Sequence, residues 1–320
     1  MHLILTGSIA IDRIMIFPGK FADVIQPDKL HVLSLSILLD SLKDTRGGVA
    51  ANIAYTLALL GEKPILYGSV GSDPWAKEYM DDLAHTGVNI EHVHYSALPT
   101  ATFTVMTDKA SCQIGGFYPG AMSDAISLNV EKFVASGEEK EEPFIVISPH
   151  DPAQMARQVE ECKRLGLRLF YDVGQQITNI SADEVRAGVE AAELLILNDY
   201  ELGVMIEKTG WSEEEINKKV KLCVTTLGKE GCQITTDGQK KHVTAAVVPD
   251  VLDPTGAGDA FRAGFLYGYL HNETPEVCAQ FGMITSAFAI EHHGTQSHTF
   301  TFDEFTLRYE ENYGKSSTKK

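Results

Sequence analysis

The feature that most constrains the fold of this chain is a regular alternation of short apolar segments with helical segments in its second half. Each apolar segment has the length of a buried strand; the first three are followed by a segment with helical periodicity and the fourth by a hairpin around Asp237-Gly238. The strands are expected at 144–148, 168–172, 194–197 and 222–226, and the helices at 153–165, 182–192 and 201–209. Short apolar strands that alternate with helices form a parallel sheet covered on both faces. The alternation therefore predicts an α/β fold.

Two parts of the first half do not follow this alternation. Residues 10–37 hold short apolar pieces separated by Pro and Gly, and residues 92–120 hold two alternating segments, 101–106 and 112–118, joined by a turn. These patterns predict a small β-rich lid. We expect the lid to comprise residues 12–37 and 92–120. We expect the large α/β domain to comprise residues 1–11, 38–91 and 121–320.

Composition and charge exclude several classes of protein. Of the 320 residues, 44% are hydrophobic, which is enough for a core, yet no apolar run approaches the roughly 18–20 residues of a membrane helix. A formal charge of −17 disfavours nucleic acid as a partner, because an acidic surface repels phosphate backbones. The start of the chain lacks the features of a signal peptide, and the five cysteines form no CxxC pair. We therefore expect a cytoplasmic protein with reduced thiols and no membrane partner.

The strongest functional signal is the sequence DPTGAGDAF at 253–261, between a strand-like segment at 245–251 and a helical segment at 260–269. A turn of small residues that enters a helix leaves N–H groups free at the positive end of the helix dipole, and this arrangement binds anions. Asp259 beside such a site suits a general base for a hydroxyl group that attacks a phosphate, although Asp also caps helices. The chain has neither a Walker loop here nor GxGxxG after its first strand, which argues against a nicotinamide oxidoreductase.

Gly47-Gly48 followed by Asn52, together with the stretch at 253–259, resembles the two signatures of the ribokinase-like (PfkB-type) kinases. The resemblance covers nearly the whole chain, and the second signature is the specific one. Four segments are similar to the bacterial adenosine kinase branch of this family: TGSIAID at 6–12, SLS at 34–36, FYPGAM at 117–122 and NDYE at 198–201.

This resemblance implies a fold and an activity. The fold would be a three-layer α/β/α sandwich around a mostly parallel sheet, in which the large domain binds the nucleotide and carries catalysis. The activity would be ATP-dependent phosphorylation of the 5′-hydroxyl group of adenosine to AMP, a reaction of purine salvage. The lid strands of this family often pair between subunits, so the resemblance also suggests a homodimer.

The resemblance assigns catalytic and substrate roles residue by residue. Asp259 would be the catalytic base, and the amides of Gly256, Ala257 and Gly258 would form an anion hole for the transferred phosphoryl group. The residues that would hold the ribose hydroxyls are Asp12, Gly48 and Asn52. Taken alone, Asp12 is equally typical of a turn and Asn52 of a helix start. Further substrate contacts would come from Ser8, Ser36 and Gln175.

The nucleotide and its metal ions would contact later segments. The loop over ATP would consist of Thr226, Leu227, Gly228, Lys229, Glu230 and Gly231, and the stretch at 287–296 would lie near the base. Asn198 and Glu201 would match an Asn-x-x-Glu motif that positions magnesium and the phosphates, with Glu201 reaching magnesium through water. The same spacing at a helix start also forms a capping box. Asp253 and Thr255 lie where some members of the family bind potassium, and the sequence leaves the presence of that ion open.

Substrate choice depends on Phe103 and Phe117, which fall on the two strands of the predicted lid hairpin. If both face the cleft, they could hold a purine between their rings, a contact that a sugar kinase does not need. If they pack into a core instead, a kinase of ribose or a related furanose becomes the better interpretation. A catalytically silent binding protein is the third alternative, against which the intact Asp259 and its glycine-rich turn both argue.

Overall fold

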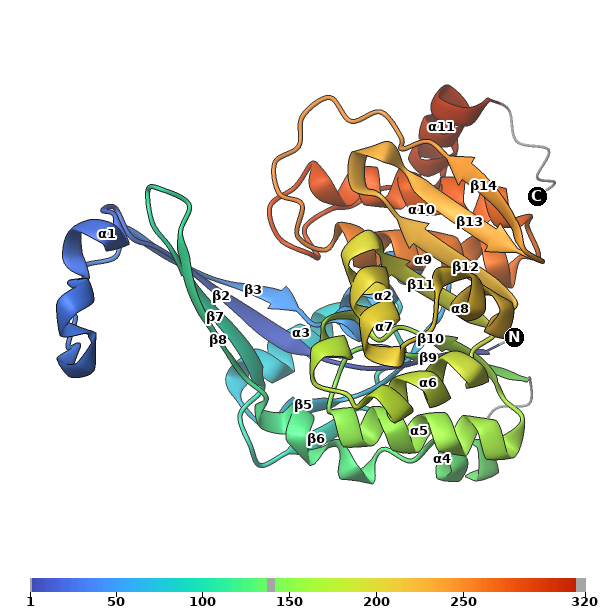
Figure 1. Ribbon diagram of the computed structural model, residues 1–320, viewed down its shortest axis with the longest axis horizontal. Helices are drawn as coiled ribbons and strands as arrows, with labels where there is room; N and C mark the ends of the chain where they lie inside the picture. Colours follow the sequence, from blue (N-terminus) through green and yellow to red (C-terminus); the bar gives the residue numbers. More distant parts are fainter. Residues whose placement is uncertain (1, 137–141, 315–320) are drawn as a thin grey trace.

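The computed structural model describes residues 2–136 and 142–314 and contains the expected α/β sandwich (Figure 1). Its centre is an eight-stranded sheet with the order β14–β13–β12–β11–β10–β9–β1–β4. The strands from β12 to β4 run parallel, whereas β13 and β14 add an antiparallel hairpin at one edge. The strands span His2–Thr6 (β1), Ile65–Tyr67 (β4), Pro143–Ile147 (β9), Arg168–Tyr171 (β10), Leu194–Asn198 (β11), Leu222–Thr226 (β12), Cys232–Thr236 (β13) and Gln239–Val243 (β14). The fold-class prediction is confirmed.

Helices cover both faces of this sheet because its strands are apolar on both sides. Leu3 and Leu5 of β1 belong to the core on one face, and Ile4 belongs to the core on the other. The first face is covered by α2 (Val49–Leu59), α3 (Pro74–Thr86), α9 (Ala257–Leu270) and α10 (Pro275–Ile290), with α11 (Phe302–Tyr313) packed on α10. The second face is covered by α4 (Val130–Ser136), α5 (Pro152–Leu165), α6 (Ala182–Ala191), α7 (Asp199–Thr209) and α8 (Glu213–Lys219).

A second, four-stranded sheet with the order β3–β2–β7–β8 extends from the sandwich as an arm, with α1 (Phe21–Val24) at its far end (Figure 1). Its strands span Ala10–Ile16 (β2), Ser41–Gly47 (β3), Ala101–Thr107 (β7) and Gln113–Tyr118 (β8). We call residues 10–47 and 101–118 the lid. The lid includes β3, although the sequence analysis grouped residues 38–91 with the large domain. The predicted hairpin at 101–118 is present as β7 and β8.

Short elements complete the described part of the chain. They are the paired strands Ser69–Gly71 (β5) and His94–Ser96 (β6) and the 3₁₀ segments Pro27–Val32 (η1), Gly120–Ser127 (η2), Gly174–Thr178 (η3) and Gly228–Glu230 (η4). The strand expected at 245–251 is wrong, because residues 244–255 run as irregular chain between β14 and α9. Among the described residues, no helix is long and apolar enough to cross a membrane.

Candidate active site

A cavity of about 460 Å³ lies where several parallel strands of the large sheet end, beneath the lid. Parallel strands bring the residues that follow them to one edge of a sheet, which is the usual position of a ligand site in such folds. Here Ser8 follows β1, Asp172 follows β10 and Asn198 ends β11. The lining residues are Ser8, Ala10, Asp12, Gly48, Val49, Asn52, Phe103, Phe117, Pro149, Asp172, Gly174, Gln175, Asn198, Glu201, Thr255, Gly256, Gly258, Asp259, Arg262 and Thr295. We call this the small cavity.

A second cavity of about 730 Å³ adjoins the first, since Asn198 and Gly258 line both. Much of its wall is apolar, and it is lined by Asn198, Asp199, Tyr200, Thr226, Gly228, Lys229, Gly231, Ala245, Ala246, Val248, Val251, Pro254, Ala257, Gly258, Phe261, Met283, Ser286, Ala287 and Ile290. We call this the large cavity. The two cavities therefore meet at the turn that begins α9.

The turn before α9 has the geometry of an anion site. Gly256 takes φ +80° at the N-cap, a left-handed conformation that favours glycine, and a Cβ there would meet Thr295 at 3.0 Å. The helix then begins at Ala257, so the N-terminus of α9 lies at the junction of the two cavities, where Gly258 lines both. The Ala257 amide is engaged within the turn, where it donates to the Pro254 carbonyl at 3.2 Å.

A chain of hydrogen bonds fixes the carboxylate of Asp259 in the first turn of α9. Asn52 Nδ2 donates to Asp259 Oδ2 at 2.7 Å, and Gln296 Nε2 donates to Asn52 Oδ1 at 2.8 Å. Gln296 also donates to the hydroxyl of Tyr79, which donates to the carbonyl of Gly47 at 2.7 Å. The orientation of Asp259 thus depends on residues from α2, α3 and the segment after α10.

The small cavity holds a cluster of carboxylates around one guanidinium group. Arg262 lies one helical turn after Asp259 and donates to Asp172 Oδ1 at 2.8 Å, while its Nη2 lies 3.8 Å from Glu201 Oε2. Among the lining residues, all within the described ranges, Arg262 is the one lysine or arginine, against the carboxylates of Asp12, Asp172, Glu201 and Asp259. Phosphates or cations that enter the cavity would change the electrostatic potential around this cluster.

Burial raises the pKa of Asp259, Asp12 and Asp172. Desolvation raises the pKa of Asp259, against the opposing effects of Arg262 and the hydrogen bond from Asn52. Desolvation and the nearby Asp259 charge raise the pKa of Asp12 to about 6. Desolvation also raises the pKa of Asp172 to about 7, although Arg262 acts in the opposite direction. Perturbed groups that share a cavity are typical of catalytic sites.

The sequence analysis missed the pair of Asp172 and Arg262. A carboxylate directly after a parallel strand, and an arginine one turn beyond Asp259, were the available signals. Gln296 and Tyr79 carried no such signal, because their contacts join segments more than 200 residues apart. Gln296 was expected near the nucleotide base with the rest of 287–296. It contacts Asn52 instead, whereas Ala287 and Ile290 do line the large cavity.

The two lid phenylalanines face the small cavity. Phe103 on β7 and Phe117 on β8 are direct cross-strand partners, and Asp12 on β2 is the partner of Phe103 on the other side. The exposed fractions of the two phenylalanines are 38% and 48%, so neither ring is packed into a core. Their position leaves two apolar rings available to a ligand in the cavity.

Other predicted site residues are divided between the two cavities. Ser8, Gly48 and Gln175 line the small cavity, as does Thr255. From the expected nucleotide loop, Thr226, Gly228, Lys229 and Gly231 line the large cavity. At Gly231 a Cβ would meet the Val243 carbonyl oxygen at 2.0 Å, and φ is +94°, so this position requires glycine.

Four predicted residues do not line either cavity. Leu227 and Glu230 belong to the nucleotide loop but are absent from its cavity-facing side. Ser36 lies in the exposed, irregular part of the lid between η1 and β3. Asp253 uses its carboxylate within the protein: Oδ1 accepts from the Thr255 amide at 2.9 Å and Oδ2 from the Gly294 amide at 3.0 Å.

The predicted Asn-x-x-Glu motif places Glu201 in the wall of the small cavity and Asn198 in the wall of both cavities. Asn198 and Glu201 form a capping box at the start of α7, with hydrogen bonds of 2.7 and 2.9 Å. In residues 2–136 and 142–314 no group of three or more His, Cys, Asp or Glu side chains is arranged to hold a metal ion. This donor set fits a hard cation that keeps its water and is bound mainly by phosphates.

Comparison with known proteins gives three consistent similarities. The family model described as pfkB family carbohydrate kinase matches residues 12–301. A nucleoside kinase from Methanothermobacter thermautotrophicus is 29% identical over 316 residues, which cover 95% of this chain and 97% of that protein. The structure of Burkholderia thailandensis nucleoside kinase in complex with inosine has a TM-score of 0.86 and 31% identity, and the match covers 98% of this chain and 99% of that one.

Two further solved structures extend this comparison. The same Burkholderia enzyme in complex with ADP-inosine has a TM-score of 0.83 and 32% identity, with 99% of each chain covered. The nucleoside kinase of Methanocaldococcus jannaschii, an archaeal member of the ribokinase family, has a TM-score of 0.86 and 27% identity. The match covers 98% of this chain and 99% of the archaeal one.

Proposed function

This chain belongs to the pfkB family of carbohydrate kinases, the ribokinase-like kinases, and we propose that it transfers the γ-phosphoryl group of ATP to the 5′-hydroxyl group of adenosine. Kinase activity toward a nucleoside or a sugar is what the chain shares with its relatives. The observation that carries the proposal is the meeting of two cavities at Gly258, beside the buried carboxylate of Asp259. A nucleoside in the small cavity and ATP in the large one would meet at that point, and the product AMP would serve purine salvage.

In the proposed reaction, Asp259 accepts the proton of the 5′-hydroxyl group as its oxygen attacks the γ-phosphorus. The new O–P bond forms while the bond from the γ-phosphorus to the bridging oxygen breaks, and ADP leaves with that oxygen. Asn52 orients the Asp259 carboxylate through its 2.7 Å hydrogen bond. The amides of Gly256 and Gly258 would offset the charge that develops on the transferred group, and Gly258 borders both cavities. The Ala257 amide, also expected there, donates to the Pro254 carbonyl.

The adenosine would lie with its ribose between the sandwich and Asp12 of the lid, and with its base against the lid phenylalanines. Asp12, Gly48 and Asn52 line the small cavity and can pair with the ribose hydroxyls. Phe103 and Phe117 can stack on the purine. Ser8 and Gln175 supply polar groups from the cavity wall, and Ser36 would reach the substrate only if the lid closes.

ATP would occupy the large cavity, with its base between apolar walls and its phosphates toward Gly258. The Burkholderia relative in complex with ADP-inosine supports adenine-nucleotide use by this family. We extend the proposal to magnesium: Glu201, through water, and Asn198 would hold the ion, which would offset the negative charge of the phosphates. We also extend it to potassium beside the 253–255 turn, held by carbonyl oxygens of Asp253 and Thr255.

The proposal also covers the movement of the lid, the oligomeric state and the cellular location. The lid would act as a separate β-rich domain that closes over the nucleoside and excludes water. Its exposed apolar residues would form a homodimer interface. The use of ATP, together with free cysteine thiols in the described chain, supports a cytoplasmic location.

An ADP-release assay with ATP and magnesium tests the proposal directly. The acceptors are adenosine, inosine, pyrimidine nucleosides, ribose and fructose phosphates. Preferential turnover of adenosine is the expected result. Preference for inosine would keep the nucleoside class and change the base. Turnover of a sugar alone would keep the proposed role of Asp259 and reject that of the phenylalanines. No turnover with any acceptor, while ligands still bind, would indicate a silent binding protein.

A further inference from the structure

One wall of the large cavity is formed by residues 244–252, whose backbone is hydrogen-bonded by side chains of α11. Residues 244–252 run as irregular chain after β14, and Ala245, Ala246, Val248 and Val251 of this segment line the large cavity. Val247 points the other way and is 73% exposed. The segment passes directly into the 253–259 turn, so its position sets both the apolar wall and the approach to the proposed phosphate site.

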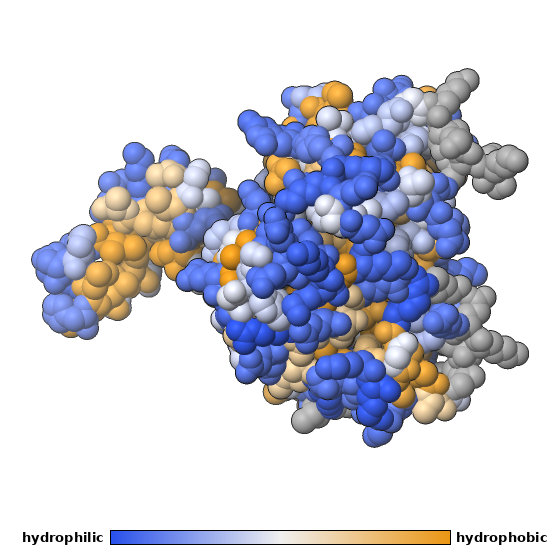
Figure 2. All heavy atoms as spheres, turned by 45° about the vertical axis from the view of Figure 1, so that its right-hand side comes forward, coloured by the Kyte–Doolittle hydropathy of each residue, from blue (hydrophilic) through white to orange (hydrophobic). Residues whose placement is uncertain are grey.

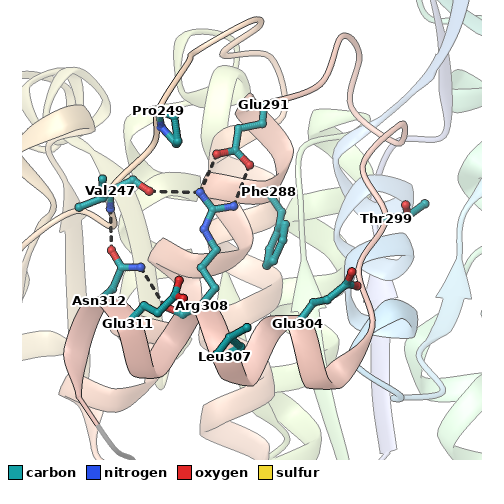
Figure 3. A pocket seen from close by; sticks show the side chains of 10 residues that line it. All are labelled: Val247, Pro249, Phe288, Glu291, Thr299, Glu304, Leu307, Arg308, Glu311 and Asn312. Atoms are coloured by element: carbon teal, nitrogen blue, oxygen red, sulfur yellow. Dashed lines mark hydrogen bonds and ion pairs between the residues drawn. The ribbon is translucent and has the colours of Figure 1, made fainter.

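Side chains of α11 take both hydrogen-bonding groups of the Val247 backbone (Figure 3). The Val247 amide donates to Asn312 Oδ1 at 2.7 Å, and Arg308 Nη2 donates to the Val247 carbonyl at 3.1 Å. Tyr313 adds a third contact, since its hydroxyl donates to the Thr244 carbonyl at 2.7 Å. These side chains satisfy backbone N–H and C=O groups that a neighbouring strand would satisfy in a sheet.

Arg308 is itself held rigidly from the side of α10. Its guanidinium group forms a bidentate pair with Glu291, with two contacts of 2.7 Å, and lies over the ring of Phe288 at 4.6 Å from the ring centroid (Figure 3). Glu291 directly follows Ile290, which lines the large cavity, and the Ile290 carbonyl accepts from the amides of Leu252 and Asp253. Both ends of the wall are therefore tied to α10 and α11.

We infer that Arg308 and Asn312 are positioning residues for the nucleotide: they hold the 244–252 segment as the wall against which the base of ATP packs. The inference rests on the proposed function, which puts ATP in the large cavity. Neither residue lines that cavity, so their effect would act through the backbone at Val247. Their substitution should therefore weaken nucleotide binding. Nucleoside binding should stay nearly unchanged, because the nucleoside contacts other elements.

The test measures ADP binding by calorimetry and steady-state KM values for ATP and adenosine. Asn312→Ala removes the acceptor for the Val247 amide, and we expect weaker ADP binding and a higher KM for ATP by roughly two- to tenfold. The KM for adenosine and kcat should stay within about twofold of the wild-type values. Asn312→Asp keeps an acceptor oxygen at the same place and should restore ADP binding.

Arg308→Met and Arg164→Met form a matched pair of arginine variants. Arg308→Met should reproduce the nucleotide-specific loss. Arg164 makes a similar bidentate pair with Glu131 between α5 and α4, away from both cavities, so its loss should change neither KM. ADP binding by Asn312→Ala equal to wild type would overturn the inference. A parallel loss of ADP binding, adenosine binding and thermal stability would overturn it too, because that pattern is general structural damage.

Failure of the inference and failure of the proposed function give different results. If the wild-type chain neither binds ADP nor turns over ATP, the proposed function fails, and the positioning role falls with it. If the wild-type chain binds ADP and phosphorylates adenosine while the α11 variants match it, the function stands and only the inference is rejected.

Discussion

At the scale of single residues, the proposed chemistry depends on one carboxylate. Asp259→Asn keeps the size of the side chain and an oxygen that can accept from Asn52, but it removes the proton acceptor. We expect kcat to fall about 10²–10⁴-fold, the usual contribution of a general base. Nucleoside affinity, measured by calorimetry, should change little. A variant that keeps more than a few per cent of wild-type kcat would show that Asp259 is not the base.

The ionisation of Asp259 depends in turn on Arg262. The base acts only when ionised, so activity falls as the pH drops through its pKa. Arg262→Met removes a cation that opposes the effect of burial, while the charge of Glu201, which raises the pKa of Asp259, remains. We expect the pKa of Asp259 to rise further when this cation is removed, which moves the acidic limb of the kcat/KM profile to higher pH.

The conservative variant separates charge from packing. Arg262→Lys keeps the positive charge and should leave the acidic limb closer to its wild-type position, even if stability drops. If Arg262→Met lowers the maximal rate but leaves the acidic limb of the kcat/KM profile at its wild-type pH, the arginine only supports the structure around Asp172.

At the scale of elements, the substrate argument rests on β7 and β8 of the lid. Phe117→Ala removes one ring from the small cavity, and stacking of a base on an aromatic ring contributes about 1–3 kcal/mol. We expect adenosine affinity to fall roughly 5- to 150-fold, with a much smaller loss for ribose, measured as inhibition constants. Ile114→Ala on the same strand is the control, because Ile114 is on the opposite face and is 52% exposed. Equal losses for adenosine and ribose would contradict the stacking role.

The elements also show what local sequence can and cannot predict. The alternation of apolar and helical segments predicted the four strands from 144 to 226 and the helices α5, α6 and α7, because their periodicity is a local property. The short helix α8 was not predicted. The apolar run at 245–251 resembled a strand for the same reason. It is not one, because its backbone partners are side chains such as Asn312 rather than a neighbouring strand. The turn at 253–259 was recognisable from its small residues, whereas Gln296 acquires its role only through contact with Asn52.

At the scale of the whole molecule, the lid presents apolar surface with no partner inside the described chain. Figure 2 shows hydrophobic residues gathered on the projecting arm, away from the polar surface of the sandwich. The exposed fractions are 56% for Leu30, 65% for Val32 and 85% for Leu38. A monomer with a formal charge of −17 would not be expected to keep a contiguous apolar patch in water unless another surface covers it.

This surface makes the proposed homodimer testable. We expect the wild-type chain to elute with twice its chain mass in size-exclusion chromatography with light scattering, and Leu38→Asp to shift it to the monomer, since a buried unpaired carboxylate is costly. Leu307→Asp changes a leucine of 59% exposure on α11, outside the lid, and should leave the dimer intact. A monomeric wild-type chain at micromolar concentration would contradict the dimer. The arguments for Asp259 and the lid phenylalanines would still stand, because those residues lie within one chain.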